Sequence, residues 1–176
     1  EVTEAINLLS DVDLAVLQCV STYPTIPNEL NLNVIKTFQK QYPNLIIGYS
    51  GHETGLSTTY AAVALGAKIV ERHITLDRSM WGTDHSASVE PHGLKTLVNN
   101  IRDIEIFGLL PQGGDSTHKS IKKIMPYKRR DDIFKDKYFK LQSNKICKTI
   151  TSHMKFDCNM YIHPTQARGL MPRDAA

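Results

Sequence analysis

The chain has 176 residues, 41% of them apolar, with 21 Lys and Arg against 18 Asp and Glu. This length allows one domain with a hydrophobic core, and the composition is that of an ordinary soluble protein. No apolar run approaches the roughly 20 residues of a membrane-spanning helix, and the N-terminus carries no signal-peptide pattern. We therefore expect no membrane association. The lack of an initiator Met suggests that the sequence begins inside a larger protein.

The predicted elements alternate between strands and helices over the first 115 residues. A helix end at 4–9 is followed by a strand at 14–19, a helix at 28–42 and a strand at 45–49. An Ala-rich helix at 55–65, a strand at 68–74 and a helix at 90–107 complete the series. This alternation predicts an α/β fold with a parallel sheet covered by helices. A doubly wound sheet and a (β/α)8 barrel both fit, although three strands cannot close a barrel.

The charge distribution divides the chain. Residues 1–115 hold 7 basic and 13 acidic side chains, whereas residues 116–176 hold 14 basic and 5 acidic ones. Such a break is typical of a domain boundary or a foreign tail. The basic part lacks a clear hydrophobic period, which predicts poor order.

The three cysteines are Cys19, Cys147 and Cys158. An odd number without a disulfide framework or a CxxC pair favours a reducing, cytoplasmic location. Cys19 lies in an apolar run, and we expect it to be a buried structural thiol.

Polar clusters follow each of the three predicted strands, where parallel α/β folds bind their ligands. His52 and His73 lie 21 residues apart, one after each of two neighbouring strands. Because neighbouring strands are about 4.8 Å apart, both imidazoles could bind one divalent metal ion. Two unrelated histidines, one buried and one solvated, explain the spacing about equally well.

Other polar residues have a functional and a structural interpretation each. Ser50 precedes a helix N-terminus and could contact a phosphate, but an ordinary helix cap is the more common case. Asp84 and His85 could bind sugar hydroxyls or transfer protons, or could be a solvated loop. Trp81 could stack on a sugar or anchor the core. Glu71 and Arg72 lie on opposite strand faces, so one of them should pair inward.

The motif series resembles the sialic acid synthase family, in order and across about residues 4–108. The matching segments are Leu17-Gln18-Cys19, Tyr23-Pro24, Gly48-Tyr49-Ser50-Gly51-His52-Glu53-Thr54-Gly55, Ala61-Ala62-Val63-Ala64-Leu65-Gly66-Ala67, Glu71-Arg72-His73-Ile74-Thr75-Leu76-Asp77 and Gly82-Thr83-Asp84-His85-Ser86-Ala87-Ser88. The resemblance is greatest to animal enzymes that make N-acetylneuraminate 9-phosphate. It implies the last three βα units of a partial (β/α)8 TIM barrel in residues 1–110, followed by a divergent, poorly ordered basic tail in 111–176.

The resemblance also implies a reaction and a set of roles. The family condenses phosphoenolpyruvate with N-acetylmannosamine or its 6-phosphate and releases phosphate by C–O cleavage. By resemblance, His52 and His73 bind Mn²⁺ or Mg²⁺, and Ser50 contacts the phosphoenolpyruvate phosphate. Ser21, Tyr23, Asp84 and His85 belong to the substrate site, and we count Asp84 with the two histidines as catalytic. The full-length family forms homodimers.

Two departures from the family lead us to expect a fragment that is inactive alone. The strands that carry the family's catalytic glutamates and phosphate-binding lysines are not in this sequence, and the similarity stops near Leu109. Three alternatives remain open: a non-catalytic metal- or sugar-binding regulatory module, another metal-dependent barrel such as an aldolase, and a nucleic-acid contact made by the basic tail. The last is unfavoured because the tail's charges are dispersed.

Overall fold

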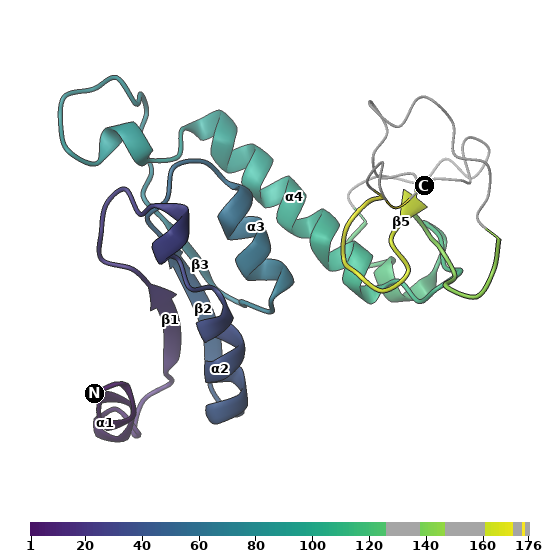
Figure 1. Cartoon of the computed structure of the whole chain (residues 1–176), viewed down its shortest axis with the longest axis horizontal. Coiled ribbons are helices and arrows are strands. Elements are labelled where there is room, and N and C mark those ends of the chain that lie inside the picture. The colour runs from purple at the N-terminus through teal and green to yellow at the C-terminus, as the bar shows by residue number, and fades with distance from the viewer. Residues whose placement is uncertain (126–137, 147–160, 171–173, 175–176) are drawn as a thin grey trace. The chain divides into compact units, whose positions relative to one another are not determined.

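A three-stranded parallel sheet lies at the centre of the first part of the chain (Figure 1). The computed structural model describes residues 1–125, 138–146, 161–170 and 174. The strands β1 (Ala15–Cys19), β2 (Ile46–Gly51) and β3 (Val70–Arg72) pair in the order β1-β2-β3. Both pairings are parallel, so the predicted α/β fold with a parallel sheet is confirmed.

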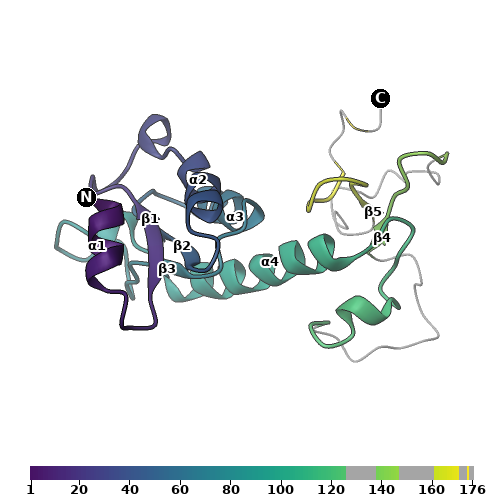
Figure 2. The same cartoon turned by 90° about the horizontal axis from the view of Figure 1, so that it is seen from below.

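The helices alternate with these strands as the sequence predicts. They are α1 (Val2–Leu8), α2 (Asn33–Gln41), α3 (Ser57–Ala64) and α4 (Pro91–Leu109). Short 3₁₀ helices occur at Pro27–Glu29, His85–Ala87 and Lys119–Ile121. Figures 1 and 2 show α2 and α3 beside the sheet, and both contact β2. Their shared core is formed by Ile35, Ile47, Tyr49, Ala62 and Ala67.

The strand register separates the side chains of β2 into two sets. Ile47 and Tyr49 point to the helix-covered face, where both are almost fully buried. Side chains alternate along a strand, so Ser50 belongs to the opposite face. Cys19 and Glu71 are the register partners of Ser50 on the neighbouring strands and therefore share that face. The sheet thus has a helix face and an opposite face, which we call the site face.

The predicted helix over residues 28–42 is two elements instead of one. A 3₁₀ turn at Pro27–Glu29 is separated from α2 by Asn31, whose φ is 43°. An asparagine tolerates this left-handed conformation better than most residues, and its side-chain amide donates to the Glu29 carbonyl. The continuous helical spacing of the apolar residues concealed this break.

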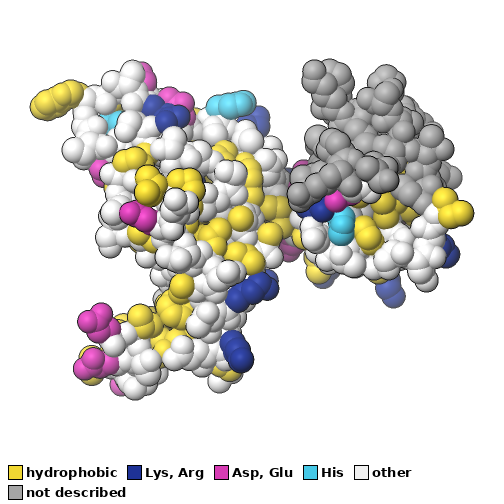
Figure 3. Space-filling model, viewed as in Figure 1, with side chains coloured by type: hydrophobic (Ala, Val, Ile, Leu, Met, Phe, Trp, Pro, Cys, Tyr) yellow, Lys and Arg dark blue, Asp and Glu magenta, His cyan; other side chains and the backbone are white. Residues whose placement is uncertain are grey.

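Several large apolar side chains of residues 1–100 are exposed to solvent, and apolar surface is visible in Figure 3. Ile46, the first residue of β2, is 51% exposed, and Ile69, directly before β3, is 38% exposed. Among the described residues, the sheet has no further strand beyond β1 or β3. Trp81 is fully exposed, so the expectation that it could anchor the core is wrong. It lies in the loop between β3 and α4, next to Met80, which is 51% exposed.

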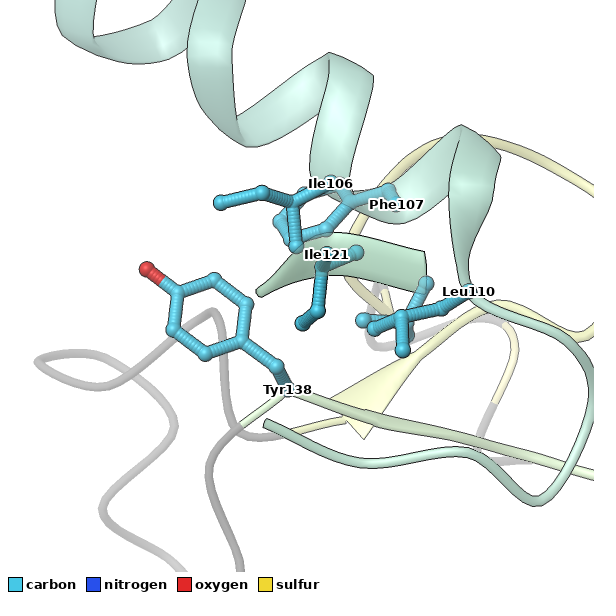
Figure 4. Packing of buried hydrophobic residues seen from close by; sticks show 6 residues of the cluster. Ile106, Phe107, Leu110, Ile121 and Tyr138 are labelled. Atoms are coloured by element: carbon cyan, nitrogen blue, oxygen red, sulfur yellow. The ribbon is translucent and has the colours of Figure 1, made fainter. Parts of the chain in front are cut away.

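The second part of the chain has its own apolar cluster. Contacts divide the chain into Glu1–Asn100 and Ile101–Ala176. Within the latter, β4 (Phe139–Lys140) and β5 (Tyr161–Ile162) pair in parallel. The cluster shown in Figure 4 contains Ile106, Phe107, Leu110, Ile121, Tyr138 and Ile162. The boundary that we expect between residues 110 and 111 follows the end of α4 and stays a prediction.

Among the described residues of this second part, Lys140 is a charged side chain that is buried, at 8% exposure. Its ammonium group donates to the Phe107 carbonyl at 2.8 Å, near the C-terminal end of α4. Burial lowers the pKa of this lysine. We expect poor order throughout residues 111–176. Part of this prediction falls outside the described residues, namely at 126–137, 147–160, 171–173 and 175–176, and so do Cys147 and Cys158.

In the described part of the chain, none of the helices combines the length and the apolar character needed to cross a bilayer.

We predict that Gly48→Ala destabilises the sheet. A Cβ at this position would lie 2.7 Å from the Ile69 carbonyl oxygen and 3.0 Å from the Ile69 Cβ. Overpacking of this kind costs about 1–3 kcal/mol of unfolding free energy, measurable by urea denaturation with circular dichroism. The control is Gly108→Ala in α4, where an added Cβ meets nothing within 4 Å. That change should stabilise by about 0.5–1 kcal/mol, and equal destabilisation by both would contradict the packing argument.

Candidate functional site

The three loops that follow the parallel strands bring their polar residues to one end of the sheet (Figure 1). Tyr23 follows β1, His52 follows β2 and His73 follows β3. The Thr25 amide donates to the His52 carbonyl at 3.0 Å, which joins the first two loops directly. This is the strand end at which parallel α/β folds bind ligands.

The rings of Tyr23, His52 and His73 form a compact group, which we call the three-ring cluster. The two imidazole centroids are 5.2 Å apart, and the planes are nearly perpendicular at 81°. The Tyr23 ring centroid lies 5.2 Å from that of His52 and 4.6 Å from that of His73. The sequence predicts that the two histidines converge, and in the structure they do.

His52 has one nitrogen inside the protein and one beside a thiol. Its Nδ1 is buried and has no hydrogen-bond partner among the described residues. Its Nε2 lies 3.9 Å from the Cys19 Sγ. Cys19 is exposed, so our expectation of a buried structural thiol is wrong. The apolar run that suggested burial ends at Cys19, which is the last residue of β1 and faces the site instead of the core.

Asp84 approaches the three-ring cluster from the loop after β3. Its carboxylate Oδ2 lies 3.6 Å from the His73 Nδ1, and both side chains are about half exposed. The Tyr23 hydroxyl donates to the Asp84 carbonyl at 3.0 Å and lies 3.1 Å from the Ser88 hydroxyl. Ser88 in turn donates to the same carbonyl at 2.7 Å. The sequence interpretation missed Ser88 as a support of this loop, because a serine among other serines carries no distinguishing signal.

The other predicted substrate residues differ in their surroundings. His85 has its Nδ1 2.7 Å from the Thr75 hydroxyl, which ties it to its own loop. Ser21 lies just beyond β1 and is exposed. Ser50 is 7% exposed, and its hydroxyl donates to the Glu71 carboxylate at 2.8 Å. The roles of these three residues as substrate contacts stay predictions.

A buried ion pair lies directly behind the three-ring cluster, on the helix face. The Arg72 and Glu53 side chains are 3% and 4% exposed, and Arg72 Nη1 donates to the Glu53 Oε1 at 2.9 Å. Glu53 also accepts from Thr59 at 2.9 Å and from Tyr49 at 2.7 Å. Burial, and then the hydrogen bond to Glu53, raises the pKa of Tyr49, so its hydroxyl stays protonated and donates. Of the two charged residues beside His73, Arg72 is thus the one that pairs inward.

The donor set of the site suits two positions of a metal coordination sphere. Imidazole nitrogens bind first-row transition metals well, and the two rings are close enough to share an ion. The unpartnered Nδ1 of His52 leaves that ring without a competing hydrogen bond on its buried side. Within the described residues, no set of three His, Cys, Asp or Glu side chains is placed to hold a metal.

Comparison with known proteins agrees with this strand-end architecture. A model of the NeuB family matches residues 1–108, which contain the sheet and the complete three-ring cluster. The chain belongs to the NeuB family. The predicted sialic acid synthase resemblance is thereby confirmed.

A human relative, N-acetylneuraminate-9-phosphate synthase, is 57% identical to this NeuB-family chain over 89 residues. The matched region covers 51% of this chain and 25% of the human protein, so the chain spans about a quarter of the length of that relative.

Two solved structures are similar in fold. The spore coat polysaccharide biosynthesis protein spsE of Bacillus subtilis has a TM-score of 0.56 and 37% identity, covering 59% of this chain and 30% of its own. The N-acetylneuraminic acid (sialic acid) synthetase of Leptospira borgpetersenii, in complex with citrate, has a TM-score of 0.56 and 34% identity. It covers 69% of this chain and 42% of its own.

We predict that Tyr23→Phe loosens the loop around Asp84 without displacing the ring. The change removes the hydroxyl that contacts the Asp84 carbonyl and Ser88. A lost hydrogen bond of this kind costs about 1 kcal/mol of unfolding free energy, with faster amide hydrogen exchange at Ser88. The control Tyr42→Phe removes an exposed hydroxyl contact to Thr3 and should change neither quantity. Unchanged exchange at Ser88 in Tyr23→Phe would contradict this account.

Proposed function

We propose that this chain supplies part of the active site of a metal-dependent sialic acid synthase. The reaction condenses phosphoenolpyruvate with N-acetylmannosamine 6-phosphate, or with N-acetylmannosamine, and yields N-acetylneuraminate, with or without a 9-phosphate, and inorganic phosphate. In it, C3 of phosphoenolpyruvate forms a bond to the aldehyde carbon of the open-chain sugar. Water adds to C2, and the C–O bond to phosphate breaks.

The observation that carries this proposal is the convergence of His52 and His73 beside Tyr23 at the strand ends. The human relative that shares 57% identity is named for this type of synthesis. The family match covers all three of these residues. Two imidazole rings 5.2 Å apart at the same end of a parallel sheet favour a shared ligand over two unrelated histidines.

A divalent ion such as Mn²⁺ or Mg²⁺, when bound, supplies the Lewis acidity that polarises a sugar aldehyde. In our proposal the imidazoles of His52 and His73 hold that ion. The Tyr23 ring packs against both imidazoles. Asp84, whose carboxylate is exposed beside His73, accepts a hydrogen bond from a sugar hydroxyl. Holding the reactants in one geometry in this way can contribute several kcal/mol to the lowering of a barrier.

Ser50 has a more restricted role in this proposal. Its hydroxyl donates to Glu71, and a phosphate beside it would lie near that carboxylate. Like charges close together repel, so the phosphate requires cationic groups that neutralise it. By family resemblance these are lysines on strands outside this sequence. We therefore propose that the phosphoenolpyruvate site is completed by residues beyond the 176 of this chain, and that this chain has no turnover by itself.

Metal binding tests the proposed site. We predict that the chain binds Mn²⁺ and that His52→Ala and His73→Ala each weaken this binding by a factor of at least about 10–100, because each removes one imidazole ligand. Isothermal titration calorimetry measures the affinity. The matched control is His92→Ala, which removes an exposed histidine in the first turn of α4. Equal affinity for all four proteins would refute a metal site at the two histidines.

A steady-state assay with both substrates and Mn²⁺ separates the enzymatic proposal from a non-catalytic one. We expect the 176-residue chain to release no inorganic phosphate. A full-length relative that has both matching histidines should release it. Loss of phosphate release in that relative on substitution of the residue that matches His73 would support the catalytic role. Turnover by the short chain above background would overturn our assignment of the missing groups. Metal binding combined with full activity of the substituted relative would favour the metal-binding module instead.

A further inference from the structure

The ion pair between Glu53 and Arg72 is adjacent in sequence to both imidazoles of the site. Glu53 directly follows His52, and Arg72 directly precedes His73. Because successive side chains point to opposite faces of an extended chain, the imidazoles face the site while the charged groups face the helices. The same two peptide segments thus carry an imidazole on one side and one member of the ion pair on the other.

The guanidinium of Arg72 fixes backbone as well as side chains. Its Nη2 donates to the Glu53 carbonyl at 2.7 Å, and its Nη1 donates to the Gly55 carbonyl at 2.9 Å. The same Nη1 contacts the Thr59 hydroxyl at 2.7 Å. Arg72 therefore binds the loop after His52 at two main-chain points and the first turns of α3 at a third. A planar guanidinium can satisfy several fixed acceptors in this way, whereas a lysine ammonium is a single point charge.

Packing around Gly51 indicates that this arrangement has little freedom to shift. A Cβ at Gly51 would lie 2.7 Å from the Glu53 Oε2, 2.8 Å from the Tyr49 ring and 2.9 Å from the Arg72 Cδ. The groups of the ion pair therefore close directly over the backbone of the residue before His52. From the other side, the Thr25 amide holds the His52 carbonyl at 3.0 Å.

From these contacts we infer that Arg72 and Glu53 are positioning residues that set the separation of the His52 and His73 imidazoles. The ion pair connects the loop after β2 to the end of β3, and the imidazoles project from the same two points of the backbone. Only one part of this inference rests on the proposed function, namely that the two positioned rings bind a metal ion together. Neither Arg72 nor Glu53 touches the ligand, since both side chains are buried on the helix face.

The test uses Arg72→Lys and Glu53→Gln, each in the whole chain. Arg72→Lys retains the positive charge but cannot make all the contacts of the guanidinium. Glu53→Gln retains the shape but removes the negative charge. In the metal-free chain, nuclear Overhauser contacts between the ring protons of His52 and His73 report their separation. We expect these contacts to weaken or vanish in both variants and the dissociation constant for Mn²⁺ to rise about tenfold, as for outer-sphere supports of metal ligands.

A milder pair of variants keeps the test valid if removal of a buried charge prevents folding. Thr59→Val removes only the hydroxyl that contacts both Arg72 and Glu53. The control Thr37→Val removes a hydroxyl that contacts its own helix at Asn33. We expect a smaller loss of ring contacts and of Mn²⁺ affinity in Thr59→Val, and no change of either in Thr37→Val. Circular dichroism verifies that each variant is folded.

The outcomes are distinguishable. A merely structural ion pair would lower the melting temperature of the folded variants but leave the ring contacts and the Mn²⁺ affinity as they were, which would overturn the inference. If the unaltered chain does not bind Mn²⁺, or if His52→Ala binds it equally well, the proposed function fails. The ring contacts of the metal-free variants would still decide whether Arg72 and Glu53 position the two imidazoles.

Discussion

The buried pair of Glu53 and Arg72 is the interaction on which the arrangement of the strand ends depends. An ion taken out of water loses its hydration, and removing one partner of a buried pair typically costs about 3–5 kcal/mol because the other is left uncompensated. Here the carboxylate receives three donors, from Tyr49, Thr59 and Arg72. The guanidinium Nε remains without a partner among the described residues, so its satisfaction is incomplete. Because a buried ion pair is weak evidence of net stabilisation, we infer that its main effect is on the geometry of the loop.

The two faces of the sheet carry different kinds of residues. The helix face carries the apolar core around Ile47 and Tyr49 together with the ion pair. The site face carries Ser50, Glu71 and Cys19 in one register row, and the imidazoles lie beyond it. Parallel pairing makes this possible, because it brings the ends of all three strands to the same side of the sheet. Neighbouring residues of one strand can thus serve two purposes: one packs in the core and the next faces the candidate site.

Much of the fold could be predicted from the sequence, because the strands of residues 1–110 are short apolar runs and the helices between them have apolar residues at helical spacing. Pro43 and Gly66 also mark the ends of α2 and α3. The convergence of His52 and His73 could also be predicted, since each follows a strand. What required coordinates was the partner of each polar group. The inward orientation of Arg72 was a choice between two neighbours, and its pairing with Glu53 depends on how the β2 loop folds back over Gly51. The exposure of Cys19 likewise depends on where β1 ends, which an apolar run does not define.

The close packing around Gly51 limits how the loop after β2 could change during evolution. With three neighbouring groups within 3 Å of the place where a side chain would begin, even an alanine would have to displace the Glu53 carboxylate, the Tyr49 ring and the Arg72 Cδ. Thr54 in the same loop is exposed and free of this restriction. Natural variation should therefore accumulate at outer positions of the loop such as Thr54, while a glycine is retained at the end of β2.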